Sequence, residues 1–281
     1  MTKLAQQLAM GYYRTKFRIL SALSKKKAAE IALELFSTPQ FRYKRPLPRI
    51  FEDAGKINFR IHGETVTGYR WNIGGQRRVL IAHGFNSSVA RFDRYIRPLV
   101  SKGYEVLAFD APAHGFSSGK TINVVVYKDM ILAIQEKYGP VQSFMGHSFG
   151  GLAICLALED IPPIEECRIV LIAPATESRT AIDLFFSFLN LNEAVRKEFD
   201  RQIYNLRNQP PEWYSVSRAV RSIKAKILWC HDEDDPITPW IDARKVMEKN
   251  HSNIEFVVTK GLGHRKIYRD NHVFKTIVDF L

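Results

Sequence analysis

Ser148 lies at the centre of the run Gly146-His147-Ser148-Phe149-Gly150, which joins an apolar stretch to a helix-forming stretch. A tight turn at this point would project the serine hydroxyl above a sheet, where side chains two residues to either side would collide. Glycine at both of those positions is therefore what a nucleophilic serine requires. The helix that follows would place its positive end and the free N–H of Phe149 near a developing oxyanion. A serine that only caps a helix in a glycine-rich turn fits the same run, so both interpretations stay open for the pattern alone.

A serine is unreactive at its own pKa and needs a general base, which in turn needs a group to orient it. His264 follows the apolar stretch near Phe256–Val258, and a cluster of acidic residues follows the apolar stretch at residues 226–230. The carboxyl ends of parallel strands meet at one edge of a sheet, where ligands bind, so these groups would gather there with Ser148. The spacing alone does not choose among the four acidic residues Asp232, Glu233, Asp234 and Asp235.

The elements that must position these groups follow a regular alternation. The runs near residues 78–82 and 168–172 are continuously apolar, as strands covered on both faces must be, whereas the first two runs alternate like an antiparallel edge hairpin. Strands are predicted near residues 57–62, 65–71, 78–82, 105–109, 142–146, 168–172, 226–230 and 254–258. Helices are predicted at residues 90–101, 123–138, 149–159, 239–249 and 270–281. The alternation predicts an α/β fold, with a mostly parallel eight-stranded sheet and helices on both faces.

Two segments interrupt this alternation. Residues 175–222 hold an aromatic, strand-free insertion that we expect to form several short helices. Residues 1–50 precede the sheet, and within them Ser24 could cap a helix that ends before Pro39. One apolar stripe of that helix consists of Ala28, Ile31, Ala32, Leu35 and Phe36.

The positive charge is unevenly distributed along the chain. Of the formal net charge of +12, residues 1–50 contribute +9, because they hold eleven basic residues and only Glu30 and Glu34 as acids. A nucleic-acid-binding domain would spread its charge more evenly, and no recognition motif is present, so no nucleic-acid partner is expected. Two interpretations of the basic segment stay open: a helix packed on the body with its lysines in solvent, or peripheral contact with an anionic membrane.

The composition, with 46% hydrophobic and 25% charged residues, is that of a globular chain and excludes wholesale disorder. The longest apolar run, Leu152–Leu158, is far too short to span a bilayer, and the first residues lack the apolar core of a secretory signal. Cys155, Cys167 and Cys230 are widely spaced and form no Cys-x-x-Cys pair. We therefore expect a cytoplasmic protein without a disulfide framework or a zinc site.

Four further motifs accompany the Ser148 turn in a fixed order. They are His83-Gly84-Phe85, the run Asp110-Ala111-Pro112-Ala113-His114-Gly115-Phe116-Ser117, the acidic loop from His231 to Pro239, and Gly263-His264. Over residues 57–281 the chain thereby resembles the α/β-hydrolase-fold serine hydrolases, which include esterases, lipases and thioesterases. Two positions depart from the family pattern, since Ala113 and Asp232 stand where glycine is usual. Both substitutions suggest slightly different loop shapes.

The resemblance implies roles for individual residues. Ser148 would be the nucleophile, His264 the base and Asp235 the carboxylate, with Asp234 or Asp232 as alternatives for the acid. The N–H groups of Phe85 and Phe149 would form the oxyanion hole. His147 is interpreted as a packing residue and His114 as a residue that shapes a loop. His231, beside the acidic cluster, could in principle bind a metal, but a loop with one functional carboxylate is preferred, and no metal or cofactor is expected.

The predicted organisation is a basic helical extension at residues 1–50 and an α/β-hydrolase domain at residues 51–281 that carries a helical lid insertion at about 175–222. The predicted function is hydrolysis of a small-molecule carboxylic ester or thioester through an acyl-enzyme intermediate. Carbon–carbon bond hydrolysis, perhydrolysis and a catalytically silent binding module remain alternatives on the same fold. The sequence does not specify the substrate or the oligomeric state.

Overall fold

A computed structural model describes residues 3–281, with side chains from residue 10 onward, so residues 1 and 2 of the predicted N-terminal extension lie outside the described residues. The chain forms two compact units. One, here called the helical unit, consists of residues 1–38 and 177–214. The other, here called the sheet unit, consists of residues 39–176 and 215–281.

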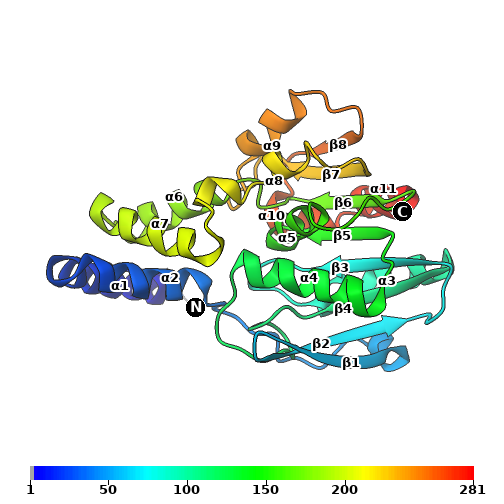
Figure 1. Cartoon of the computed structure of the whole chain (residues 1–281), viewed down its shortest axis with the longest axis horizontal. Helices are drawn as coiled ribbons and strands as arrows, with labels where there is room; N and C mark the ends of the chain where they lie inside the picture. Colours follow the sequence, from blue (N-terminus) through cyan, green and yellow to red (C-terminus); the bar gives the residue numbers. More distant parts are fainter. Residues whose placement is uncertain (1–2) are drawn as a thin grey trace. The chain divides into compact units, whose positions relative to one another are not determined.

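The sheet unit contains eight strands in the order β1-β2-β4-β3-β5-β6-β7-β8 (Figure 1). Their bounds are β1 Gly55–Ile61, β2 Glu64–Trp71, β3 Arg77–Ala82, β4 Tyr104–Phe109, β5 Ser143–His147, β6 Arg168–Ile172, β7 Lys226–Asp232 and β8 Ile254–Thr259. β1 and β2 form an antiparallel hairpin at one edge, β2 is antiparallel to β4, and the remaining pairs are parallel. The predicted mostly parallel sheet with its antiparallel edge is confirmed.

Helices cover both faces of this sheet. α3 (Asp93–Ser101) and α11 (Asn271–Phe280) pack together on one face, and α4 (Val124–Tyr138) and α5 (Phe149–Leu158) pack together on the other (Figure 1). The helix predicted from residue 90 begins as the 3-10 turn η2 (Val89–Phe92), because the Ser88 hydroxyl caps the N–H of Ala90 there. Three shorter helices complete this unit: α8 (Val216–Ala219), α9 (Trp240–Met247) and α10 (Gly263–Lys266).

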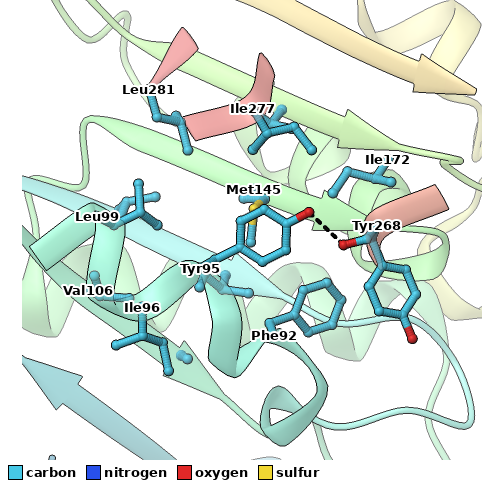
Figure 2. Close-up of a cluster of buried hydrophobic side chains, with 14 of the residues drawn as sticks. Phe92, Tyr95, Ile96, Leu99, Val106, Met145, Ile172, Tyr268, Ile277 and Leu281 are labelled. Carbon is cyan, nitrogen blue, oxygen red and sulfur yellow. Dashed lines mark hydrogen bonds between the residues drawn. The ribbon is translucent and has the colours of Figure 1, made fainter. Parts of the chain in front are cut away.

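The core on the α3 and α11 face is built from alternate residues of the strands. Figure 2 shows Val106, Met145 and Ile172 of the sheet against Tyr95 and Leu99 of α3. All of these side chains are buried, and the Tyr95 hydroxyl donates a hydrogen bond of 2.7 Å to the Tyr268 carbonyl. The turn after α10 that carries Tyr268 is thereby tied to the core rather than left as a free loop.

The helical unit consists of the two helical segments that interrupt the strand–helix alternation, one before β1 and the other between β6 and β7. It contains α1 (Lys3–Leu23), α2 (Lys25–Ser37), α6 (Ser178–Leu189), α7 (Glu193–Arg207) and the turn η3 (Pro211–Trp213). The predicted cap is present, since the Ser24 hydroxyl accepts a hydrogen bond from the Lys27 N–H. α1, for which the sequence analysis assigns no separate helix, precedes it.

The apolar stripe of α2 packs against α7, which belongs to the insertion between β6 and β7. Ala28 and Ala32 are fully buried, and Phe36 contacts Phe185 and Phe199 edge to face. Small residues let the two helices approach closely, and the aromatic rings close the end of the interface. Among the helices formed by residues 3–281, none combines the length and the apolar character needed to cross a membrane.

Candidate active site

Ser148 adopts the strained backbone that a nucleophile turn requires, with φ at 53° and ψ at −120°. The flanking glycines are sterically necessary. A Cβ at Gly146 would lie 2.7 Å from the Gly151 Cα, and a Cβ at Gly150 would lie 2.4 Å from the Ala82 carbonyl oxygen. The turn thus lets α5 start directly at the carboxyl end of β5, and Ser148 lies at the helix N-terminus without capping it through its side chain. A serine whose role was only to cap this helix would bond to the first turn, so the capping interpretation is not what the structure shows.

The loops after β7 and β8 bring an acid and a base together. The Nδ1–H of His264 donates a hydrogen bond of 2.8 Å to Oδ2 of Asp235. The other carboxylate oxygen of Asp235 accepts the backbone N–H groups of Ile237 and Thr238 at 2.8 and 3.0 Å. Burial opposes ionisation of this carboxyl, but these hydrogen bonds and the charge of His264 outweigh it and lower the pKa of Asp235.

His147, the residue before Ser148 in the turn, contacts the segment that carries His264. The ring of His147 lies 4.7 Å from the ring of His264, and its Nε2–H donates a hydrogen bond of 3.0 Å to the His264 carbonyl. Within residues 3–281, the Ser148 hydroxyl itself forms no hydrogen bond with the His264 ring. Bonds between a nucleophile and its base are often long without substrate and tighten when it binds.

His147 is a neutral packing residue in this arrangement. Its side chain is buried, and burial together with the nearby charge of His264 lowers the pKa of His147 to about 3. The Nδ1 atom is buried without a hydrogen-bond partner among the described residues, and it faces Gly84, where a Cβ would approach to 2.8 Å. A neutral ring at this position places no second positive charge beside His264.

The two residues expected to form an oxyanion hole lie next to each other, since the rings of Phe85 and Phe149 contact edge to face at 5.8 Å. A Cβ at Gly84 would lie 3.0 Å from the Ser148 Cβ, so the backbone before Phe85 passes directly against the nucleophile turn. Phe149 is the first residue of α5, and the N–H of such a residue has no partner within its helix. The arrangement suits two backbone donors aimed at one oxygen atom.

Two buried histidines hold the loop that carries Phe85. His83 accepts the Ala111 N–H at 3.0 Å, and His114 accepts the Asn86 N–H at 3.2 Å, so each joins the loop after β3 to the loop after β4. Burial lowers the pKa of His83 to about 4 and that of His114 to about 3, which keeps both rings neutral and able to accept. His114 thus shapes a loop, in line with its interpretation from the sequence.

The departures from the family pattern have different consequences. Ala113 takes a φ of 66°, a left-handed conformation that glycine adopts more easily, so the loop keeps this backbone shape in spite of the side chain. Asp232, one of the alternatives for the acid in the sequence analysis, is buried and accepts the N–H groups of Leu262 and Gly263 at 3.0 and 2.9 Å. The residue that replaces a glycine therefore anchors the segment that leads into His264.

Sequence reasoning missed Thr238 as well. Its hydroxyl donates to Oδ2 of Asp235 at 2.8 Å and lies 3.1 Å from Nδ1 of His264. A hydroxyl residue three positions after an acid in a proline-rich loop is the signal that could have indicated it. His231 uses both ring nitrogens in hydrogen bonds, with Thr238 and with Trp229, which leaves no nitrogen free for a metal.

The three cysteines are buried and free of disulfides. Burial raises the pKa of the Cys167 thiol to about 11 and that of Cys230 to about 12, and it raises the pKa of Cys155 further. Thiols held protonated in this way are poor nucleophiles. No group of three or more metal-ligating side chains that could hold an ion occurs in the part of the chain that the structure describes.

Comparison with known proteins agrees with this architecture. Residues 75–215 match the family model described as serine aminopeptidase, S33, a span that includes Ser148 but ends before Asp235 and His264. No curated protein matches the chain.

Many solved structures share the fold. An esterase of Pyrococcus furiosus is 21% identical, with a TM-score of 0.63 over 87% of this chain and 97% of its own. A monoacylglycerol lipase of Paleococcus ferrophilus is 21% identical, with a TM-score of 0.58 over 76% of this chain and 97% of its own. A thioesterase domain from the curacin biosynthetic pathway is 14% identical, with a TM-score of 0.59 over 80% of this chain and 98% of its own. At these identities the likeness shows the α/β-hydrolase fold.

Proposed function

Because the chain belongs to the α/β-hydrolase family described as serine aminopeptidase, S33, we propose that it is a serine hydrolase that cleaves a carboxylic ester or a thioester. The observation that carries the proposal is the hydrogen bond between His264 and Asp235 at the same sheet edge as the strained turn of Ser148. A base oriented by a buried carboxylate, beside a serine on such a turn, is the arrangement that activates a hydroxyl nucleophile.

The reaction would proceed in two halves. The Ser148 oxygen attacks the substrate carbonyl carbon while Nε2 of His264 takes the hydroxyl proton, and the N–H groups of Phe85 and Phe149 bind the oxyanion. The proton then passes to the leaving alcohol or thiol, and an acyl-enzyme remains. Water attacks the acyl carbon with the same base, which releases the acid and restores Ser148. Asp235 keeps the proton of His264 on Nδ1, so that Nε2 is the atom that accepts.

The electrostatics of the loops around the site favour a neutral acyl substrate over an α-amino peptide. An aminopeptidase needs a free carboxylate to bind the substrate ammonium group. In the loops that form the site, the buried carboxylates of Asp110, Asp232 and Asp235 are each occupied by backbone N–H donors. The neighbouring carboxylates of Glu233 and Asp234 are exposed to solvent. The esterase, the lipase and the thioesterase that share the fold are consistent with ester and thioester substrates.

The test combines a covalent probe with substrate profiling. A fluorophosphonate probe should label the wild-type chain and the exposed-serine control Ser101→Ala, but not Ser148→Ala. p-Nitrophenyl esters of graded chain length and acyl thioesters should be turned over, and Ser148→Ala should lower kcat by on the order of 10⁶, the loss that removal of a triad nucleophile causes. Circular dichroism of the variant should match the wild type, because the substituted side chain is small and lies on a turn.

Two results would overturn the proposal. Turnover by Ser148→Ala above a few per cent of the wild-type rate would exclude Ser148 as the nucleophile. Efficient cleavage of aminoacyl arylamides with no turnover of esters or thioesters would show that the chain is an amidase instead.

A further inference from the structure

The helical unit exposes more apolar surface than its size predicts. It holds about a quarter of the residues, yet seven of the thirteen large exposed hydrophobic side chains among the described residues belong to it. Three of the seven lie on α1: Tyr12, Ile19 and Leu23, with exposed fractions of 63%, 55% and 79%. Exposed side chains of this size that gather on one element mark an interaction site more often than scattered ones do.

These three residues form one continuous face of the helix. Tyr12, Ile19 and Leu23 recur at i, i+7 and i+11, and the side chain of Lys16 at i+4 falls on the same face. We call Tyr12, Ile19 and Leu23 the α1 stripe. On another side of the helix, Phe17 is 1% exposed, so α1 uses that side for packing within the helical unit. The α1 stripe therefore takes no part in the packing of the helical unit.

The stripe is accompanied by positive charge that the fold does not neutralise. The basic residues around it, here called the basic flank, are Lys16, Lys25 and Lys26, and none of the three forms an ion pair within residues 3–281. Between Lys3 and Leu23 no acidic residue occurs.

In the insertion, the other part of the helical unit, arginine side chains form ion pairs. Arg179, Arg196 and Arg201 of the insertion each pair with a carboxylate. Over residues 177–214 five basic residues meet six acidic ones, so the excess positive charge of the helical unit belongs to residues 1–38.

We propose that the α1 stripe and the basic flank form a surface that binds an anionic lipid bilayer. An interfacial helix lies in the plane of the membrane, with its apolar face among the acyl chains and its basic residues at the lipid phosphates. Nucleic acid would neutralise the charge but leave Ile19 and Leu23 in water. A second copy docked face to face would bring the two basic flanks together, which like charges oppose. The inference concerns the helical unit alone and needs no catalytic activity.

The first experiment is co-sedimentation of the full chain with phosphatidylcholine vesicles, prepared with and without phosphatidylglycerol. Binding should require phosphatidylglycerol and should fall as salt is raised, because the Debye length shrinks from about 8 Å at physiological ionic strength to about 3 Å at 1 M. Ser148→Ala should bind like the wild type, so that failure of this inference and failure of the proposed function can be told apart.

Matched variants separate the contributions of the two features. Ile19→Asn with Leu23→Asn should lower the partition coefficient by about tenfold or more for each residue, whereas Ile73→Asn with Ile241→Asn, two aliphatic residues of similar exposure in the sheet unit, should not. Lys25→Gln with Lys26→Gln should lower it by about fivefold for each base, whereas Lys249→Gln with Lys275→Gln should leave it unchanged.

Equal binding to neutral and anionic vesicles, or no binding to either, would overturn the proposal. So would stripe variants that bind like the wild type. Light-scattering chromatography and retention on immobilised DNA complete the test. Self-association or DNA retention that the stripe variants abolish, without vesicle binding by the wild type, would assign the surface to a different partner.

Discussion

Asp232, the last residue of β7, and Asp235, three residues later in the loop that follows, bind different atoms of the segment that carries His264. Asp235 accepts the side-chain Nδ1–H of His264, whereas Asp232 accepts the backbone N–H groups of Leu262 and Gly263 just before it. Both carboxyls are buried, and in both cases hydrogen-bond donors outweigh the burial and lower the pKa. One carboxylate thus sets the tautomer of the base, and the other sets where its backbone lies.

At the residue scale, Asp235→Asn should lower kcat by about 10⁴ and leave the fold intact. The backbone donors of Ile237 and Thr238 would keep the amide oxygen at the Oδ1 position. The amide nitrogen would then face His264 and donate a hydrogen bond to Nδ1. The proton of the imidazole ring would therefore lie on Nε2, and a protonated Nε2 cannot accept the proton of the Ser148 hydroxyl. Steady-state ester hydrolysis measures the loss. Asp234→Asn, at an exposed neighbour, is the control, and a larger loss there than at Asp235 would place the acid one residue earlier.

At the element scale, the site depends on how the loop after β7 is joined to the loop after β8. Besides the two backbone bonds, Asp232 accepts the Thr259 hydroxyl at 2.7 Å and the Asp234 N–H at 3.1 Å, so both of its oxygens receive donors only. Asp234 adds a single exposed bond of 3.1 Å from the Gly261 N–H. Beyond the backbone pairing of β7 with β8, the side-chain hydrogen bonds that join the ends of these two strands therefore come mainly from one buried carboxylate.

Asp232→Asn should destabilise this junction, because an amide nitrogen would face donors where the carboxylate oxygen accepts. We expect a loss of about 1–3 kcal/mol in the free energy of unfolding, as for a buried group left without a partner. Urea unfolding measures it, and amide exchange at Leu262 and Gly263 should become faster. Asp234→Asn, which perturbs one exposed bond, should change stability by less than about 1 kcal/mol. Equal effects of the two variants would contradict the role of Asp232 as the anchor.

At the scale of the whole molecule, the sheet unit buries three neutral histidines, one in the nucleophile turn and two in the loops after β3 and β4. Burial lowers the pKa of His83 to about 4 and those of His114 and His147 to about 3, from an ordinary value of 6.5. The rings of His83 and His114 each accept a backbone N–H, which only the neutral form can do. Because these rings take up protons more readily in the unfolded chain, the free energy of unfolding depends on pH.

Stability should therefore rise as pH increases from about 4 to about 6.5 and level off above that range. Between the folded and unfolded pKa values the unfolded chain binds the additional protons, so acid favours unfolding. The slope should be about 1 kcal/mol per pH unit for each histidine that remains neutral in the folded state. Urea unfolding at several pH values measures it, and His114→Asn should reduce the slope by one group. A stability that is flat across this range would contradict the burial of neutral rings.

The strands, the mostly parallel sheet with its antiparallel edge and the sheet edge that carries the candidate residues could be predicted from the sequence, because they depend on local patterns. The order of the strands within the sheet could not, because it depends on which strands pair. Continuous apolar runs predict buried strands wherever they fold, and parallel strands bring their carboxyl ends to one edge. Ser148, the acidic loop and His264 each follow such a run, so their convergence needed no knowledge of tertiary contacts. The glycines around Ser148 likewise follow from the space that a tight turn allows.

What only the tertiary structure decided are contacts between segments far apart in the chain. Nothing local distinguishes Asp232 from its acidic neighbours, since its role depends on the N–H groups of residues 262 and 263, which reach it only after β7 and β8 pair. The same holds for His114, whose partner Asn86 lies on another loop. No helix is predicted from the sequence for the residues of α1, and the sequence could not tell which face of that helix is covered. Burial is decided by the helices that pack against α1, and those leave the face of Ile19 and Leu23 in solvent.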